Sequence, residues 1–347
     1  MSSLALILSI LILSFIITSI AIVPFINLLY KLKFQRANQV TRDTFGVLTP
    51  VFNKFHKTKA GVPVGGGLLV IIVVSVLFAL LIPMVKHFGV DVTSNYATIQ
   101  NEINIIFFTL LSFGLLGLYD DVMKFFNLKK KGLFGLRMKH KFIFEIIISF
   151  AIAMMMYYNL GISILHIPFI GTFQMGIFYI PFATFTIVSF ANAVNISDGL
   201  DGLAAGSLMI SLFGLWFLSS AILDVPISIF LALFIGSLIS FLYFNVFPAR
   251  IFMGDVGSLA FGATLAVVGL LLGKVIALVV ISFIFVLEIS TSLIQLLSKK
   301  FLKRKIFPAA PIHLSLQKYG WEEPKIVQRA WLLQIMLTIF GVWLAVL

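Results

Sequence analysis

The chain has 347 residues, of which 61% are hydrophobic and 11% are charged, and its mean hydropathy is +1.12. Soluble domains are roughly half apolar and a quarter charged, so this composition excludes a soluble enzyme. It also excludes a disordered chain, which needs low hydrophobicity and high charge. The absence of cysteine excludes disulfides, thiolate metal sites and a cysteine nucleophile. A helical protein that crosses a membrane several times remains.

The apolar runs predict an all-α integral membrane protein, because each transmembrane helix needs about 20 apolar residues. We expect a single membrane domain over residues 1–347 with ten transmembrane helices. In chain order these are 3–30, 63–85, 102–119, 140–160, 177–196, 203–222, 227–247, 257–273, 275–297 and 326–346. The connection at 161–176 carries Ile, Phe and Thr residues between glycines, which predicts a short outer β-hairpin.

The net charge of +12 would suggest a nucleic-acid partner in a soluble protein, but in a membrane protein the placement of the charges decides. Of the 25 Lys and Arg residues, all except Lys86 and Lys274 fall in one alternate set of connecting segments and the adjoining helix ends. That set is 31–62, 120–139, 197–202, 248–256 and 298–325. Since positive charge is retained in the cytoplasm, these segments are predicted to face it, both termini lie outside, and no nucleic acid is expected.

Five of the 13 acidic residues lie at predicted cytoplasmic helix ends, within LYDDVMKFF, NAVNISDGLDGLAAG and FPARIFMGDVGSLAFG. They are Asp120, Asp121, Asp198, Asp201 and Asp255. Helix capping accounts for the last three, because an Asp at a helix start accepts hydrogen bonds from free N–H groups. It does not account for the adjacent pair at a helix C-terminus, where the dipole disfavours negative charge. Such a pair needs a cation, and Mg²⁺ with a diphosphate substrate suits carboxylates ringed by lysines.

Two further features allow more than one interpretation. Glycines flank these acids and recur in GVPVGGG at 61–67. Glycine lets backbone N–H groups approach a phosphate. It also lets helices pack closely in a membrane, which is the alternative interpretation. Glu145 and Glu288 lie within predicted spans, where an ionisable group is costly. Glu288 indicates either a break in the ninth helix or a buried hydrogen bond.

Together with the tail PIHLSLQKYGWEEPKIVQRAW, the three acidic motifs resemble the polyprenyl-phosphate N-acetylhexosamine-1-phosphate transferases. The similarity runs from about Lys59 to the C-terminus and is greatest to the branch that transfers phospho-N-acetylmuramoyl-pentapeptide. It implies a multi-pass enzyme of the bacterial inner membrane whose five cytoplasmic loops form the active site. The phosphate of undecaprenyl phosphate attacks the sugar-bearing phosphate of UDP-MurNAc-pentapeptide directly, which releases UMP and forms the first lipid-linked peptidoglycan precursor. Mg²⁺ is the implied cofactor, membrane lipid surrounds the protein, and a homodimer is common in the family.

By motif position, the resemblance implies a role for each of several residues. Asp255 corresponds to the Mg²⁺ ligand, and Asp120 and Asp121 correspond to the pair that positions or deprotonates the lipid phosphate. Asp198 is a further catalytic candidate. The implied substrate contacts are Asn192, Asn195, Asp201, Lys131, Lys59 and His313.

One departure from the resembled branch bears on the sugar. His313-Leu314-Ser315 stands where that branch has three consecutive histidines, in a loop associated with the UDP-sugar. UDP-GlcNAc or another UDP-HexNAc is therefore an alternative substrate, and an inactive homologue is a further alternative. A transporter is the alternative of another class, and it is disfavoured because transporters bind substrate near the bilayer midplane.

Overall fold

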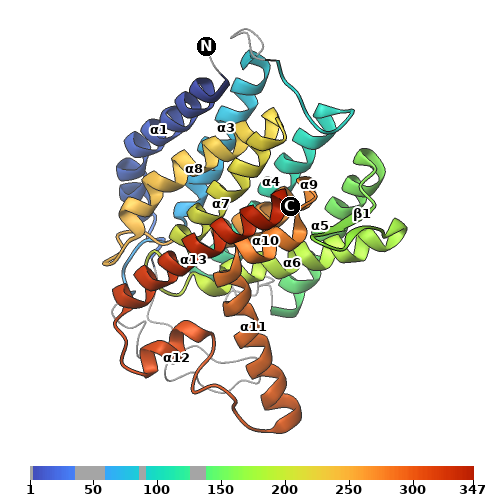
Figure 1. The fold of residues 1–347 in the computed structure, drawn as a ribbon. Coiled ribbons are helices and arrows are strands. Elements are labelled where there is room, and N and C mark those ends of the chain that lie inside the picture. Colours follow the sequence, from blue (N-terminus) through green and yellow to red (C-terminus); the bar gives the residue numbers. More distant parts are fainter. Residues whose placement is uncertain (1–2, 36–58, 86–90, 126–137) are drawn as a thin grey trace.

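The computed structural model describes residues 3–35, 59–85, 91–125 and 138–347 (Figure 1). Within these ranges nine helices are long and apolar enough to span a membrane. They are α1 (Ser3–Lys31), α3 (Gly66–Val85), α4 (Ile99–Phe125), α5 (Met138–Leu160), α6 (Tyr179–Ser197), α7 (Leu203–Ala221), α8 (Val225–Asn245), α9 (Gly254–Leu271) and α13 (Glu323–Val346). The predicted all-α integral membrane fold is confirmed.

Two helices form the centre of the bundle. In α8 and α9, 94% of the residues in the most apolar stretch are buried inside the protein. A helix that is apolar on every side is buried, because it has no polar face to present to water. α1 and α3 pack on α8, while α4 and α6 pack on α9. The outer helices keep one apolar face exposed, as expected for contact with lipid.

The ninth predicted span, 275–297, is wrong as a single helix. It consists of α10 (Val275–Ile281) and α11 (Phe283–Leu297), which meet at Ser282 with a bend of 84°. Buried side chains satisfy the backbone groups that the break frees: Ser211 Oγ donates to the Ile281 carbonyl at 2.9 Å, and Gln334 Oε1 accepts from the Ile284 N–H at 3.1 Å. Backbone can leave the helical pattern at membrane depth only where such partners exist.

Beyond the break, α11 runs away from the bundle, and Figure 1 shows it beneath the other helices together with α12 (Ile312–Lys318). The π-helical turn η5 (Ser298–Leu302) ends α11. Glu288 lies on α11, so this acid does follow a broken helix. The break therefore places a segment of the predicted cytoplasmic tail against the end of the bundle.

The segments predicted to share the outer side contact one another. The Val225 N–H donates to the Thr93 carbonyl at 3.0 Å, and Asn101 Nδ2 donates to the Asn159 carbonyl at 3.3 Å. The expected hairpin forms from β1 (Ile164–Ile167) and β2 (Gly171–Gln174), which pair antiparallel, and the 3₁₀ turn η4 (Gly176–Phe178) leads from it into α6. Segments 86–101 and 223–226, which the charge pattern predicts on one side of the membrane, thus contact each other through Thr93 and Val225.

Candidate active site

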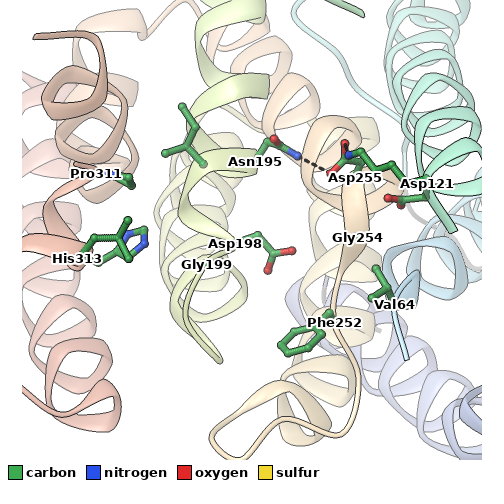
Figure 2. A pocket seen from close by; sticks show the side chains of 13 residues that line it. Val64, Asp121, Asn195, Asp198, Gly199, Phe252, Gly254, Asp255, Pro311 and His313 are labelled. Atoms are coloured by element: carbon green, nitrogen blue, oxygen red, sulfur yellow. Dashed lines mark hydrogen bonds and ion pairs between the residues drawn. The ribbon is translucent and has the colours of Figure 1, made fainter. Parts of the chain in front are cut away.

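A cavity of about 330 Å³ lies where five separate segments of the chain meet. Figure 2 shows Asp198 between His313 on one side and Asp255 and Asp121 on the other. The lining consists of Val64, Asp121, Lys124, Asn195, Ile196, Asp198, Gly199, Phe252, Gly254, Asp255, Pro311, His313 and Leu314. Five of the residues predicted from sequence therefore share one cavity wall.

The close approach of α4 to α9 brings the acidic motifs together. A Cβ atom on Gly117 would overlap the Asp255 carbonyl oxygen, so only glycine allows α4 to lie this close to the start of α9. α4 also continues beyond its predicted end at 119, so Asp120 and Asp121 lie within its last turns. α9 begins at Gly254 rather than at 257, which puts Asp255 in its first turn.

Asp121 caps a helix other than its own. Its Oδ2 accepts a hydrogen bond from the Val256 N–H at 3.0 Å, at the N-terminus of α9. Gly254 has φ of +79°, and a Cβ there would lie 2.7 Å from the same Oδ2, so the turn before α9 requires glycine. The expectation that capping cannot account for Asp121 was wrong, because the N–H groups that it satisfies belong to a helix distant in sequence.

Two lysines join Asp120 to Asp255. Lys124 Nζ lies 2.7 Å from Asp255 Oδ2 and 3.0 Å from Asp120 Oδ2. Lys141 Nζ lies 2.6 Å and 3.2 Å from the same two oxygens. Each lysine thus contacts both carboxyl groups, and such partners are needed because a buried charge is stable only when paired.

The sequence predicted neither lysine as part of the site, and its spacing indicated Lys141 only as a partner of Glu145 four residues later. Lys124 follows Asp120 at the i+4 spacing that lets helical side chains meet, and this signal was available. Lys141 opens a different helix, so no local pattern connects it to the acids. Lys124 is 37% exposed and lines the cavity, which makes it available to a bound anion.

The two asparagines of α6 have different surroundings. Asn195 Nδ2 donates to Asp255 Oδ1 at 3.1 Å and to Ser258 Oγ at 2.7 Å, so it orients the Asp255 carboxylate. Asn192, one turn earlier, donates to Glu145 Oε2 at 2.6 Å and does not belong to the cavity lining. It is therefore a support for α5 and α6 rather than part of the wall.

Lys59 and Asp201 lie beside the cavity in a buried ionic cluster with Glu323. Lys59 Nζ lies 2.7 Å from Asp201 Oδ1 and 2.5 Å from Glu323 Oε1, and it donates to the Gly199 carbonyl at 3.1 Å. Asp201 Oδ2 accepts from the Ala249 N–H at 2.9 Å. The expectation that Asp201 caps a helix is therefore wrong, because no side chain caps the N-terminus of α7. The cluster fastens the α6–α7 turn to the start of α13. Lys131 lies outside the described residues.

The glycines of GVPVGGG serve packing. The N–H groups of Gly65, Gly66 and Gly67 donate to the carbonyls of Phe252 and Met253 at 2.9–3.1 Å, so they are not free for a phosphate. A Cβ on Gly67 would overlap the Gly257 backbone. Of the two interpretations, close helix packing is the one that holds for this motif.

The acids of the cavity suit a hard divalent cation. Asp121, Asp198 and Asp255 all line it, and Asp120 is tied to Asp255 through the shared lysines. Over the part of the chain that the structure describes, no three His, Asp or Glu side chains form a preassembled metal cluster. Mg²⁺ does not need one, because it is usually held by one or two carboxylates with water and substrate phosphates completing its shell. The donor set therefore fits Mg²⁺ bound together with a phosphate substrate.

Comparison with known proteins adds an independent line of argument. The profile of glycosyl transferase family 4 matches residues 103–273. A phospho-N-acetylmuramoyl-pentapeptide-transferase of Borreliella burgdorferi (strain ZS7) is 35% identical over 342 residues, covering 93% of this chain and 90% of that protein. The protein of that name from Clostridium perfringens (strain 13 / Type A) is 37% identical over 317 residues, 91% of each chain. One from Staphylococcus epidermidis (strain ATCC 35984) is 35% identical over 296 residues, covering 84% of this chain and 87% of that one.

Proposed function

The chain belongs to glycosyl transferase family 4 and is similar over most of its length to phospho-N-acetylmuramoyl-pentapeptide-transferases. We propose that it catalyses the same reaction, the transfer of phospho-N-acetylmuramoyl-pentapeptide to a lipid phosphate. The donor is UDP-MurNAc-pentapeptide and the acceptor is undecaprenyl phosphate. The products are UMP and the first lipid-linked precursor of peptidoglycan. The active site faces the cytoplasm from the bacterial inner membrane, in keeping with the cations of its loops.

The reaction needs two phosphates to meet. An oxygen of the lipid phosphate forms a bond to the sugar-bearing phosphorus, and the bond from that phosphorus to the bridging oxygen of the diphosphate breaks. The electron pair leaves with UMP. A lipid phosphate is largely ionised near neutral pH, because its second pKa is about 6. A strong base is therefore not required, and the harder task is to screen the charges of the two reactants.

Different residues in and beside the cavity would screen the charges of the two phosphates. Asp255, oriented by Asn195, would hold Mg²⁺ with Asp121 or Asp198 beside it. Bound there, the ion supplies charge neutralisation at phosphate oxygens. Lys124 and Lys141 carry the positive charge that a second anion requires, and Lys124 reaches the cavity surface. Asp120 keeps both ammonium groups in place when phosphate oxygens compete for them.

The observation that carries the proposal is the convergence of Asp120 and Asp255 on the same two lysines. These residues come from α4, α5 and α9, and the contacts place carboxyl and ammonium groups together at the wall formed by Lys124 and Asp255. A site built for two phosphates and a divalent ion needs that combination. A membrane transporter binds its substrate near the bilayer midplane, whereas Asp120 lies in the last turns of α4 and Asp255 in the first turn of α9.

The test is a reconstitution of the purified protein with undecaprenyl phosphate and Mg²⁺. UDP-MurNAc-pentapeptide and UDP-GlcNAc are supplied in separate reactions, and UMP and the lipid product are measured together. We expect UMP and lipid-linked sugar in equal amounts with UDP-MurNAc-pentapeptide, and none when Mg²⁺ is chelated. Turnover with UDP-GlcNAc alone would reassign the donor, and no UMP from either donor would contradict the proposal.

A further inference from the structure

We propose that Glu288 is a positioning residue that orients His313 toward the nucleotide-sugar, an inference that rests on the proposed function. Glu288 lies outside the three acidic motifs and has no role in the proposed transfer. It lies on α11, beyond the break at Ser282, and its side chain is 3% exposed. An acid buried at this depth is costly and calls for a polar partner.

The partner is the histidine of the cavity. His313 Nδ1 lies 2.9 Å from Glu288 Oε2, and the His313 side chain is itself buried. In the proposed arrangement Glu288 acts as a carboxylate, which can only accept, and Nδ1 of His313 is the donor of this hydrogen bond. A carboxylate at one ring nitrogen determines which tautomer is present and fixes the orientation of the ring.

The other ring nitrogen faces the cavity wall. A Cβ atom built on Gly199 would lie 2.8 Å from His313 Nε2, so this nitrogen lies against the turn that carries Asp198. Figure 2 shows His313 across the cavity from Asp255, with Asp198 between them. With Nδ1 engaged by Glu288, Nε2 is the ring atom that can meet a polar group of the bound nucleotide-sugar, such as a phosphate oxygen.

The broken helix explains how Glu288 reaches this position. A straight continuation of α10 would carry Glu288 along the axis of the span, whereas the bend of 84° at Ser282 turns α11 toward α12. Gln334 and Ser211 bind the freed backbone groups and hold the bend. The bend, the acid and the histidine thus form one support for the cavity wall opposite the lysines.

Activity measurements on five variants test the inference. Removing a partner that orients a metal-bound histidine typically costs about 10–100-fold in activity, and we expect a loss of that order in kcat for Glu288→Ala. Glu288→Gln should recover part of it, because its amide oxygen can still accept from Nδ1. In a His313→Ala background, adding Glu288→Ala should cause no further loss. Glu102→Gln is the matched control, since Glu102 is also a buried acid in a membrane helix but lies at the other end of α4 from the site.

Equal losses from Glu288→Ala with and without His313 would overturn the inference, because the acid would then act elsewhere. A second measurement does not depend on turnover. In protein labelled with ¹⁵N-histidine, the ring signal that His313→Ala removes should shift in Glu288→Ala and stay unchanged in Glu102→Gln. An unchanged signal in Glu288→Ala would refute the positioning role even if the wild type transferred no sugar, whereas a shifted signal in an inactive wild type would contradict only the proposed function.

Discussion

Lys141 and Asp255 stand 114 residues apart in the chain, and the distance between Lys141 Nζ and Asp255 Oδ2 is 2.6 Å. This ion pair joins the start of α5 to the start of α9, and Lys124 and Asp120 complete a cluster of four side chains. Because the cluster borders the cavity, a phosphate that enters meets cations already held in place. Preorganised charge of this kind stabilises a reacting anion without reorganisation at the moment of reaction.

Substitution of the central carboxylate should abolish transfer. Asp255→Asn preserves the shape of the side chain but removes the charge that would hold Mg²⁺ and both lysines. We expect UMP release, measured below the unfolding temperature, to fall by roughly 10²–10³-fold or more. The thermal unfolding temperature in detergent should also fall, because Lys124 and Lys141 lose a carboxylate partner. Asp91→Asn, at an exposed position among the predicted outer segments, is the control. Turnover near the wild-type rate in Asp255→Asn would remove this residue from the site.

Two glycines one turn apart in α4 test whether close packing against α9 requires glycine at position 117 in particular. In Gly117→Ala the new Cβ would overlap the Asp255 carbonyl, and α4 must move away from α9. Overpacking of this kind costs about 1–3 kcal/mol, and a shift of about 1 Å in the acids can cost about 10²-fold in rate. In Gly114→Ala the nearest atom is Ile71 Cδ1 at 3.0 Å, the end of a flexible side chain. Thermal unfolding and UMP release should therefore be affected in the first variant and nearly normal in the second.

Histidine at the two positions after His313 should have opposite effects. Leu314 lines the cavity, so Leu314→His adds a second imidazole to the wall. We expect a several-fold rise in kcat/KM for UDP-MurNAc-pentapeptide relative to UDP-GlcNAc. Ser315 Oγ contacts the Ala309 carbonyl and accepts from the Ala309 N–H at 3.3 Å. Ser315→His should break that connection, displace Pro311 from the wall and lower kcat/KM for both donors. An unchanged ratio in Leu314→His would show that this position does not select the sugar.

A carboxyl pair at the N-terminal ends of α4 and α8 predicts a pH dependence of stability. Asp224 caps α8 by accepting from the Ile227 N–H at 3.1 Å, and it also contacts Glu102. Burial raises the pKa of the Asp224 carboxyl above its ordinary value. The folded protein then binds more protons than the unfolded chain, so the free energy of unfolding falls as the pH rises from the usual range of aspartate through the raised pKa.

Glu102→Gln should reduce that dependence, since its amide can donate to Asp224 in place of a shared proton. We expect it to raise the free energy of unfolding at pH 7.5 by about 1 kcal/mol, the value of a typical hydrogen bond, and by less at pH 5. Thermal unfolding in detergent at both values measures the difference. A stabilisation that is the same at pH 5 and pH 7.5 would contradict the role of protonation, while catalytic turnover should remain unchanged.

The membrane fold and the identity of the principal acids follow from the sequence alone. Apolar runs long enough to span a bilayer are local properties, because the free energy of transfer into lipid is summed over neighbouring residues. The distribution of Lys and Arg is equally local. For the same reason the hairpin at 164–174 and the position of Asp255 near a helix start were predictable.

Only the tertiary structure decided which of these groups meet. The close approach of α4 to α9 depends on Gly117 and Gly254, where a Cβ atom would overlap the other helix. That overlap arises only when the two helices are in contact, so the sequence alone does not reveal it. The same holds for Lys141, for Asp121 as the cap of α9, and for the break at Ser282, which needs Gln334 from a distant helix. A contact between two residues that are far apart in the chain produces no periodic pattern in the sequence. The sequence around each partner shows only the periodicity of its own helix.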